Sequence, residues 1–289
     1  MDAISELKPA LFNNELSTIK VRLLKDVCLS YGRKTTAPAI NSHDHCLVYI
    51  TEGNGYHYID GRSTYCKPGT LLILTKYQVH RFMEVKSWDG IVVYYSEKDL
   101  ITKDNLTASN MLKRSIRQLD VIYNVNELIE SDLTSLYREG LNQSDSLSLT
   151  LQKNILQNIL YKCILRSDNV CVQVEPENDM ELFSSFIDMV EERCTEEHNL
   201  NFYLEALDVS RKKLNALCRK YEDTTGKKLI DKYLLSDIKH QLVYSNDPIS
   251  VISVNTGFSE STNLSKFFRK YTGISPREFR RSFYVRSAA

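Results

Sequence analysis

The C-terminal third of this chain carries a short polar surface whose side chains are suited to hydrogen bonding with DNA bases. Four apolar residues recur at the spacing of one helix face: Leu214, Leu217, Cys218 and Tyr221. Four polar residues are left on the outer face of the same segment: Arg211, Lys212, Asn215 and Arg219. An asparagine amide can pair with adenine through two hydrogen bonds, and arginine or lysine can contact guanine. We therefore predict a helix here that can read base edges.

The elements that would position these side chains form a helix-turn-helix pattern, and the pattern occurs twice. In the first copy a short helix from Tyr203 and a turn precede Ser210, a suitable N-cap for the reading helix. In the second copy a short helix from Ile249, a turn at Gly257 and a second helix follow one another. Such a unit places its second helix in the DNA major groove. A longer helix joins the two units through one apolar face: Ile230, Leu234, Ile238 and Leu242. We therefore predict an all-helical DNA-binding domain over residues 181–284.

Charge is distributed unevenly along the chain. The whole sequence balances 37 Lys and Arg residues against 37 Asp and Glu residues. From Asn201 to the end there are 16 basic and 9 acidic residues, which leaves 21 basic and 28 acidic residues in the rest. A basic C-terminal third on an acidic body is typical of a nucleic-acid-binding module attached to another domain. The pattern favours double-stranded DNA as a partner.

Length and composition exclude several classes of protein. With 289 residues, of which 42% are hydrophobic, the chain can form two ordinary cores. Residues 1–16 lack the apolar run of a signal peptide, and no segment approaches the ~18 apolar residues of a membrane span. The 7 cysteines are scattered without a C-x-x-C pair, which favours reduced thiols over a disulfide framework or a zinc site. We expect a soluble cytoplasmic protein without a membrane partner.

The first hundred residues predict β-structure. Short apolar or alternating runs cover residues 20–31, 46–51, 55–59, 71–75 and 91–95. Turn signals separate the runs, and Asp60-Gly61 is a strong hairpin signal between two of them. Strands of this number and spacing indicate a small barrel or jelly roll, whose interior can hold a ligand.

Helical periodicity follows the predicted strands. Residues 106–119 are compatible with a helix or a lid, and residues 147–165 predict a long helix. One stripe of the long helix is apolar: Leu151, Ile155, Ile159 and Cys163. The apolar surface is wide enough for two partners, the barrel and another subunit, although a helix that only covers its own barrel fits equally well. Residues 171–180 indicate a linker, so the N-terminal domain covers residues 1–170.

The second helix-turn-helix unit carries a specific set of residues. They are Ile249, Ile252, Ser253, Gly257-Phe258-Ser259, Phe267-Phe268-Arg269, Gly273, Ser275-Pro276 and Phe279-Arg280. With these residues the chain resembles the AraC/XylS family of transcription regulators. The first unit departs from the family pattern, because Leu204 stands at a usually small position and Asp208 and Asp223 stand at usual glycines. The N-terminal half resembles the cupin-like effector domain of the same family through His43-x-His45, Glu52-Gly53-x-Gly55, Asp60-Gly61, Lys67-Pro68-Gly69-Thr70 and His80.

The resemblance implies an α+β protein of two domains. The N-terminal domain is expected to be a cupin-like β-barrel with dimerisation helices, and the C-terminal domain to be all-α with two helix-turn-helix units. The family's base-contacting positions correspond to Arg211, Lys212, Asn215 and Ala216 in the first unit and to Ser261, Thr262, Asn263 and Lys266 in the second. Arg219 faces outward beside the first set, and phosphate contacts are expected from Arg269 and Lys270.

The resemblance also implies partners for the N-terminal domain. A small organic effector is expected inside the barrel, lined by His43, His45, Tyr49, Tyr58, His80 and Phe82. A homodimer is expected through Leu151, Ile155 and Ile159. RNA polymerase is the expected partner of an activator, and neither a cofactor nor a metal is expected.

Two other functions fit parts of the pattern. A metal-dependent cupin enzyme with an accessory DNA-binding tail would use a His-x-His motif, a glutamate and a later histidine as metal ligands. Here Tyr49 and Ile50 occupy the positions where that carboxylate is expected, and Glu52 lies in the turn instead. The missing carboxylate argues against the enzyme. A regulator controlled by a protein partner at its N-terminal half is the other alternative.

Overall fold

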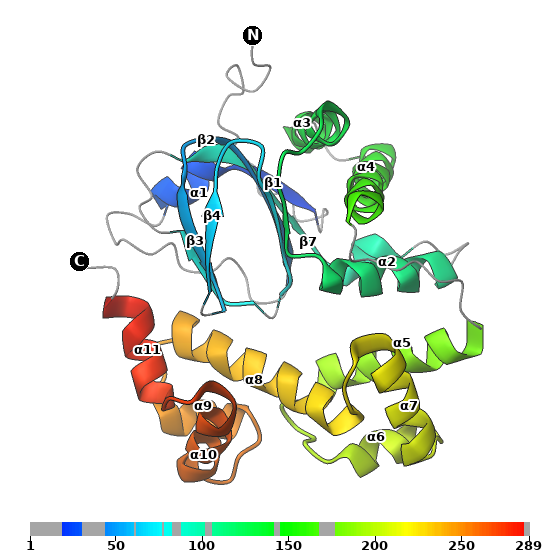
Figure 1. The fold of residues 1–289 in the computed structure, drawn as a ribbon, viewed down its shortest axis with the longest axis vertical. Coiled ribbons are helices and arrows are strands. Elements are labelled where there is room, and N and C mark those ends of the chain that lie inside the picture. The colour runs from blue at the N-terminus through cyan, green and yellow to red at the C-terminus, as the bar shows by residue number, and fades with distance from the viewer. Residues whose placement is uncertain are drawn as a thin grey trace. The chain divides into compact units, whose positions relative to one another are not determined.

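The structure is a computed structural model. It describes residues 19–30, 44–60, 62–76, 78–82, 88–101, 106–141, 145–167 and 177–285. The chain divides into two compact units, Met1–Gln173 and Val174–Ala289 (Figure 1). Within the described part of the chain, none of the helices is long and apolar enough to cross a membrane.

The N-terminal unit contains two antiparallel sheets. The five-stranded sheet has the order β1 (Lys20–Leu23), β7 (Asp89–Tyr95), β2 (His45–Glu52), β5 (Leu71–Leu74) and β8 (Val121–Ile122). The three-stranded sheet has the order β4 (Arg62–Cys66), β3 (Gly55–Ile59) and β6 (His80–Phe82). In the residues described, the strands form two sheets, which agrees with the predicted cupin-like domain, although the sheets do not close into a barrel.

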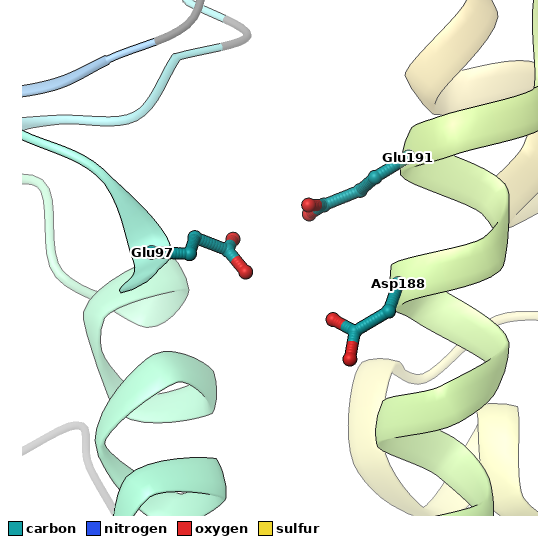
Figure 2. A group of neighbouring side chains, drawn as sticks. All are labelled: Glu97, Asp188 and Glu191. Carbon is teal, nitrogen blue, oxygen red and sulfur yellow. The ribbon is translucent and has the colours of Figure 1, made fainter. Parts of the chain in front are cut away.

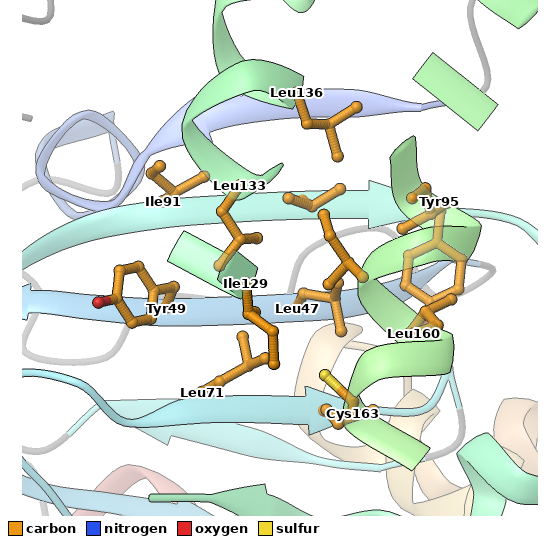
Figure 3. Packing of buried hydrophobic residues seen from close by; sticks show 14 of the residues in the cluster. Leu47, Tyr49, Leu71, Ile91, Tyr95, Ile129, Leu133, Leu136, Leu160 and Cys163 are labelled. Carbon is orange, nitrogen blue, oxygen red and sulfur yellow. The ribbon is translucent and has the colours of Figure 1, made fainter. Parts of the chain in front are cut away.

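Alternate residues of the central strand β2 enter two different cores. Leu47 and Tyr49 belong to a helix-side core, which Figure 3 shows between the large sheet and residues of two helices, among them Ile129, Leu133 and Leu160. Val48 and Ile50, on the other side of the strand, belong to an inter-sheet core that also holds residues of the small sheet. The inter-sheet core consists of Leu24, Val27, Cys46, Val48, Ile50, Ile59, Cys66, Leu72, Leu74, Trp88, Val92 and Tyr94. Because successive side chains of a strand point to opposite faces, both faces of β2 are buried.

Within the residues that the structure describes, five helical segments accompany the sheets. They are α1 (Leu24–Ser30), the 3₁₀ helix η2 (Glu97–Leu100), α2 (Leu106–Gln118), α3 (Glu127–Leu141) and α4 (Ser146–Arg166). The strand predicted over residues 20–31 is wrong beyond Leu23, because α1 begins at Leu24. The predicted helix over residues 147–165 is confirmed as α4, which packs beside α3.

The C-terminal unit is entirely helical in the residues described. Its helices are α5 (Glu177–Arg193), α6 (Leu200–Ala206), α7 (Arg211–Glu222), α8 (Gly226–Tyr244), α9 (Ile249–Asn255), α10 (Ser261–Thr272) and α11 (Pro276–Val285). Residues 177–180 of the predicted linker are therefore helical. Figure 2 shows Asp188 and Glu191 projecting from one face of α5.

Caps and cores explain why these helices begin and pack where they do. The Ser210 hydroxyl accepts a hydrogen bond from the Lys213 backbone at 3.2 Å, which satisfies a free amide at the start of α7. The four apolar residues predicted for the inner face of α7 are buried: Leu214, Leu217, Cys218 and Tyr221. The core of the second helix-turn-helix unit contains Leu234, Ile238, Leu242, Ile252, Leu264 and Phe268. Since α8 contributes to this core and also packs against α6 and α7, it joins the two units.

Candidate nucleic-acid and effector sites

The second helix-turn-helix unit consists of α9, a turn at Gly257 and α10. Gly257 has a φ of 75°, and a Cβ there would collide with the Thr195 carbonyl oxygen, so both the turn and its packing require glycine. Leu264 and Phe268 are fully buried on the inner face of α10. The outer face is polar and exposed at Thr262, Asn263, Lys266, Arg269 and Lys270, with Ser261 half-buried beside them. The predicted reading residues of this unit therefore share one accessible surface.

The contacts of these α10 side chains are local. The Thr262 hydroxyl donates to Glu260 Oε2 at 2.9 Å, and Arg269 lies 4.0 Å from Glu278. The ammonium of Lys270 lies 4.9 Å from the ring centre of Tyr271. Exposed pairs of this kind contribute little to stability, so a DNA duplex can replace them at small cost.

The first unit consists of α6, a turn and α7, and its polar surface is more constrained. Lys212 and Arg219 are exposed, whereas Arg211 donates to the Asn201 side-chain oxygen at 2.6 Å. Asn215 is half-buried, and its side-chain oxygen accepts a hydrogen bond from the Gly226 backbone at 2.9 Å. That oxygen is also the acceptor that pairing with adenine would use. The structure therefore gives Asn215 a role at the start of α8 that the sequence did not indicate.

Two of the residues predicted to line the barrel lie on the helix side of the large sheet. His45 is buried and stacks on Tyr95, with ring centres 5.2 Å apart, and Tyr95 belongs to the helix-side core. Tyr49 belongs to the same core, where burial first, and then the nearby Glu130, raises the pKa of the phenol to about 12. The prediction that these two side chains line the space between the sheets is therefore wrong.

Glu97 sits at the centre of a charged cluster on the helix side. Figure 2 shows its carboxylate extending from the start of η2. Arg117 lies 3.4 Å from this carboxylate, and Lys113 and His45 each lie 3.5 Å from it. Burial alone would raise the pKa of Glu97, but the neighbouring His45, Arg117 and Lys76 outweigh it and hold that pKa well below its ordinary value. Nε2 of His45 therefore faces this carboxylate on the helix side of the large sheet.

A histidine pair lies on the inter-sheet side of the small sheet. His57 shares one side of β3 with Ile59, a member of the inter-sheet core, and His80 is paired with Ile59 across the sheet. The two imidazoles are 3.1 Å apart between Nε2 of His57 and Nδ1 of His80, so one ring nitrogen donates to the other. Burial lowers the pKa of His80 to about 4, and burial together with the neighbouring His80 lowers the pKa of His57 well below its ordinary value. Both rings are therefore neutral near pH 7.

The remaining predicted lining residues divide between other positions. His80 faces the inter-sheet core, but Tyr58 alternates with His57 and points to the opposite side of β3. His43 and the side chain of Phe82 lie outside the part of the chain that the structure describes. The histidines suggested for a metal site do not converge, because His45 and His80 face different sides of the fold. Strand alternation in β3 is the signal that could have identified His57.

Comparison with known proteins identifies both halves. A profile described as a helix-turn-helix domain matches residues 203–282, and one described as an AraC-like ligand binding domain matches residues 29–119. Together they cover more than half of the chain. The chain belongs to the AraC/XylS family of transcription regulators. This AraC-type regulator combines an N-terminal effector-binding domain with a C-terminal DNA-binding domain.

Relatives of this AraC-type chain extend over most of its length. It is 24% identical over 289 residues to the raffinose operon transcriptional regulatory protein RafR of Pediococcus pentosaceus, covering 94% of this chain and 100% of RafR. It is 21% identical to the HTH-type transcriptional activator RhaS of Escherichia coli, covering 82% of this chain and 86% of RhaS. The fold resembles that of ToxT from Vibrio cholerae with a TM-score of 0.50 at 13% identity, covering 91% of this chain and 98% of ToxT. The relatives are regulators, which points to a non-enzymatic role.

Proposed function

We propose that this AraC-type chain acts in the cytoplasm as a transcription activator, binding promoter DNA through both helix-turn-helix units and cooperating with RNA polymerase. The observation that carries the DNA part is the accessible polar face of α10 together with the exposed Lys212 and Arg219 of α7. In this proposal Ser261, Thr262, Asn263 and Lys266 contact bases in one groove segment. Lys212 and Arg211 contact bases in another, once Arg211 leaves Asn201.

The phosphate-contacting residues of the proposal are Arg219, Arg269 and Lys270. All three are exposed on the last turns of the reading helices, beyond the residues proposed for base contact. Phosphate contacts orient a protein on the duplex and make its affinity depend on salt, without selecting a sequence.

The effector of this proposal is a small hydroxylated molecule that binds on the inter-sheet side of the N-terminal domain. His57 and His80 supply two neutral polar groups among apolar residues, and a neutral imidazole can donate to or accept from a hydroxyl group. The inter-sheet core residues and the two histidines include no carboxylate, so an uncharged ligand suits this group of residues best. The name of RafR links that relative to a raffinose operon, which supports a sugar as the class to test first.

The homodimer of this proposal uses the outer face of α4, and its residues differ from the set expected from sequence. Ile159 is fully buried in the helix-side core, and Ile155 packs against that core, so both serve the fold of one subunit. Four large hydrophobic side chains of α4 are instead exposed: Leu147 80%, Leu151 45%, Tyr161 38% and Leu165 82%. With the exposed Asn154 and Asn158 they follow a spacing of four and three residues, which is the seam of a two-stranded coiled coil. An identical helix of a second copy is therefore the proposed occupant.

Footprinting of the full-length protein tests the DNA part. The probe is a duplex of about 40 base pairs selected from a randomised pool by the protein itself. Two reading helices on one face of the duplex are expected to protect two major-groove segments about 34 Å apart. Protection of a single segment by the monomer would show that the first unit does not engage DNA.

A further inference from the structure

The two helix-turn-helix units of the C-terminal domain touch directly as well as through α8. The turn of the second unit packs on the segment that precedes α6, where Gly257 lies against Thr195. Nε2 of His198, in the same segment, lies 2.9 Å from the Thr256 carbonyl oxygen, so this nitrogen carries the donated hydrogen. His198 comes just before Asn199, the N-cap of α6. The start of the first unit is therefore bonded to the turn of the second.

A polar arm connects the segment before α6 with the last turn of α10 through α8. Lys227 donates to the His198 carbonyl oxygen at 2.9 Å and to Asp231 Oδ1 at 2.6 Å. The other oxygen of Asp231 accepts from the Tyr271 hydroxyl of α10 at 2.6 Å. Asp231 is only 5% exposed, so its two charge-assisted bonds are shielded from water. The arm thus runs from the first unit to the last turn of α10.

A series of aromatic contacts, the aromatic arm, forms a second connection between His198 and Tyr271. His198 contacts Phe258, Phe258 contacts Phe267, and Phe267 contacts Tyr271, with ring centres 4.8, 5.5 and 5.0 Å apart. Both arms begin at His198 and end at Tyr271. We call this closed set of contacts the inter-unit ring, formed by His198, Lys227, Asp231, Phe258, Phe267 and Tyr271.

We propose that the inter-unit ring fixes the orientation of α10 relative to α7 and thereby sets the spacing of the two DNA half-sites that the protein accepts. The proposal rests on the proposed function, in which both units engage DNA. Helix α8 packs against both units, and the inter-unit ring adds attachments at His198 and Tyr271 that further restrict rotation of the second unit about this helix. Asp231, His198 and Tyr271 are positioning residues in this scheme, because none of them is assigned to contact DNA.

Half-site spacing is a sensitive measure of this orientation. One inserted base pair moves a half-site by about 3.4 Å and rotates it by about 34° around the duplex axis. A rigid pair of reading helices cannot follow that displacement without losing contacts in one groove. A pair that is free to rotate can follow part of it.

The experiment compares three duplexes and four full-length proteins. The duplexes are the selected one, the same duplex with one base pair inserted between the half-sites, and a duplex that keeps only the half-site of the second unit. The proteins are the unaltered chain, Tyr271→Phe, His198→Ala and the control Phe186→Leu. Tyr271→Phe removes only the hydroxyl that bonds to Asp231, whereas Phe186 is a fully buried residue of α5 outside the inter-unit ring.

We expect the unaltered chain and Phe186→Leu to bind the inserted duplex about tenfold more weakly than the selected one, the scale of one disrupted base contact. Tyr271→Phe is expected to reduce this penalty to about threefold while its affinity for the single half-site stays unchanged. His198→Ala, which breaks the other end of the ring, is expected to act in the same direction.

Three results would overturn the inference. The first is that Tyr271→Phe still binds the inserted duplex about tenfold more weakly than the selected one, and the second is that the unaltered chain binds both duplexes equally. The third is that Phe186→Leu tolerates the inserted base pair as well as Tyr271→Phe does, since this would reflect a general loosening of the domain. Failure of the proposed function has a different signature, because the footprint of the unaltered chain then covers one groove segment and the inserted base pair has no second contact to displace.

Discussion

At the residue scale, the basic side chains of α10 differ in what they can contact. Lys266 lies with Thr262 and Asn263 on the outer face of the first two turns, whereas Arg269 lies in the last turn near Glu278. We expect Lys266→Ala to change the preference at particular base pairs by about 1–3 kcal/mol, because it removes a base contact. Arg269→Ala is expected to weaken binding to all sequences and to reduce the salt slope by about 1, because it removes a phosphate contact.

Binding titrations at several salt concentrations, on the selected duplex and on its single-base variants, check both expectations. Lys232→Ala is the control, since Lys232 is an exposed lysine of α8 paired with Glu222 and is not assigned to DNA. Equal losses on every sequence in Lys266→Ala and Arg269→Ala would remove the distinction between base and phosphate contacts.

Two aspartates show how a departure from the family pattern is accommodated by the fold. Asp208 and Asp223 have φ values of 49° and 48°, the left-handed conformation that the family's usual glycines adopt without strain. Aspartate is among the residues that tolerate this conformation, because its short polar side chain can bond locally. The sequence identified the departures, and the fold of the first unit follows the family pattern through both turns.

The lining of the N-terminal site was harder to predict, for a reason specific to β2. Residues 46–50 are all apolar or aromatic, and the structure buries both faces of the strand. Without an alternation of polar and apolar residues, the sequence does not indicate which side chains point toward which core. His45 and Tyr49 were assigned to the wrong side for this reason, while His57 was overlooked between two more exposed tyrosines.

At the scale of single elements, α4 has two apolar faces, one buried inside the subunit and one exposed. Its inner residues, such as Leu156 and Ile159, are fully buried against the sheet and α3, while Leu147 and Leu165 are almost fully exposed. The sequence showed a wide apolar surface on this helix. The sequence does not indicate which of its residues pack inside the subunit and which remain exposed, because that depends on the tertiary contacts. Helix α3 was not predicted, although it covers the same core.

The outer stripe of α4 gives a direct test of the proposed dimer. We expect Leu151→Asp to yield a monomer with a folded N-terminal domain, because the carboxylate would be buried without a partner in the seam but solvated in the monomer. Light scattering measures the oligomeric state, and circular dichroism reports the fold. Glu127→Lys, a surface change on α3 away from the stripe, is the control. A dimer that persists in Leu151→Asp would assign the interface to another surface.

At the scale of the whole molecule, the uneven charge and the change from strand to helix periodicity predicted two domains, and the chain does form two compact units. The all-helical C-terminal half was the most predictable part, because its apolar residues recur on one face of each helix and its turns carry caps and glycines. The cupin-like N-terminal domain was confirmed, although its two sheets do not close into a barrel. Sheet closure depends on pairing between distant strands, which local sequence patterns do not specify.

Coupling between the two domains leads to the last prediction. An effector that binds the active arrangement better than the inactive one must change both the stability of the full-length protein and its affinity for DNA. We expect a thermal-shift screen of sugars and related hydroxylated compounds to find a ligand that stabilises the protein by about 2.7 kcal/mol at about 100 times its Kd. The same ligand is expected to alter binding to the selected duplex.

Two variants of neighbouring strands connect this effect to the histidine pair. His80→Leu is expected to abolish the ligand-induced shift, because it removes one imidazole from the inter-sheet side, whereas Tyr58→Phe, which alters the opposite side of β3, is expected to retain it. A ligand that stabilises both variants equally binds elsewhere, and one that stabilises the protein without changing its DNA affinity does not control it. Only a ligand that depends on His80 and also shifts DNA binding fits an effector held between the two sheets.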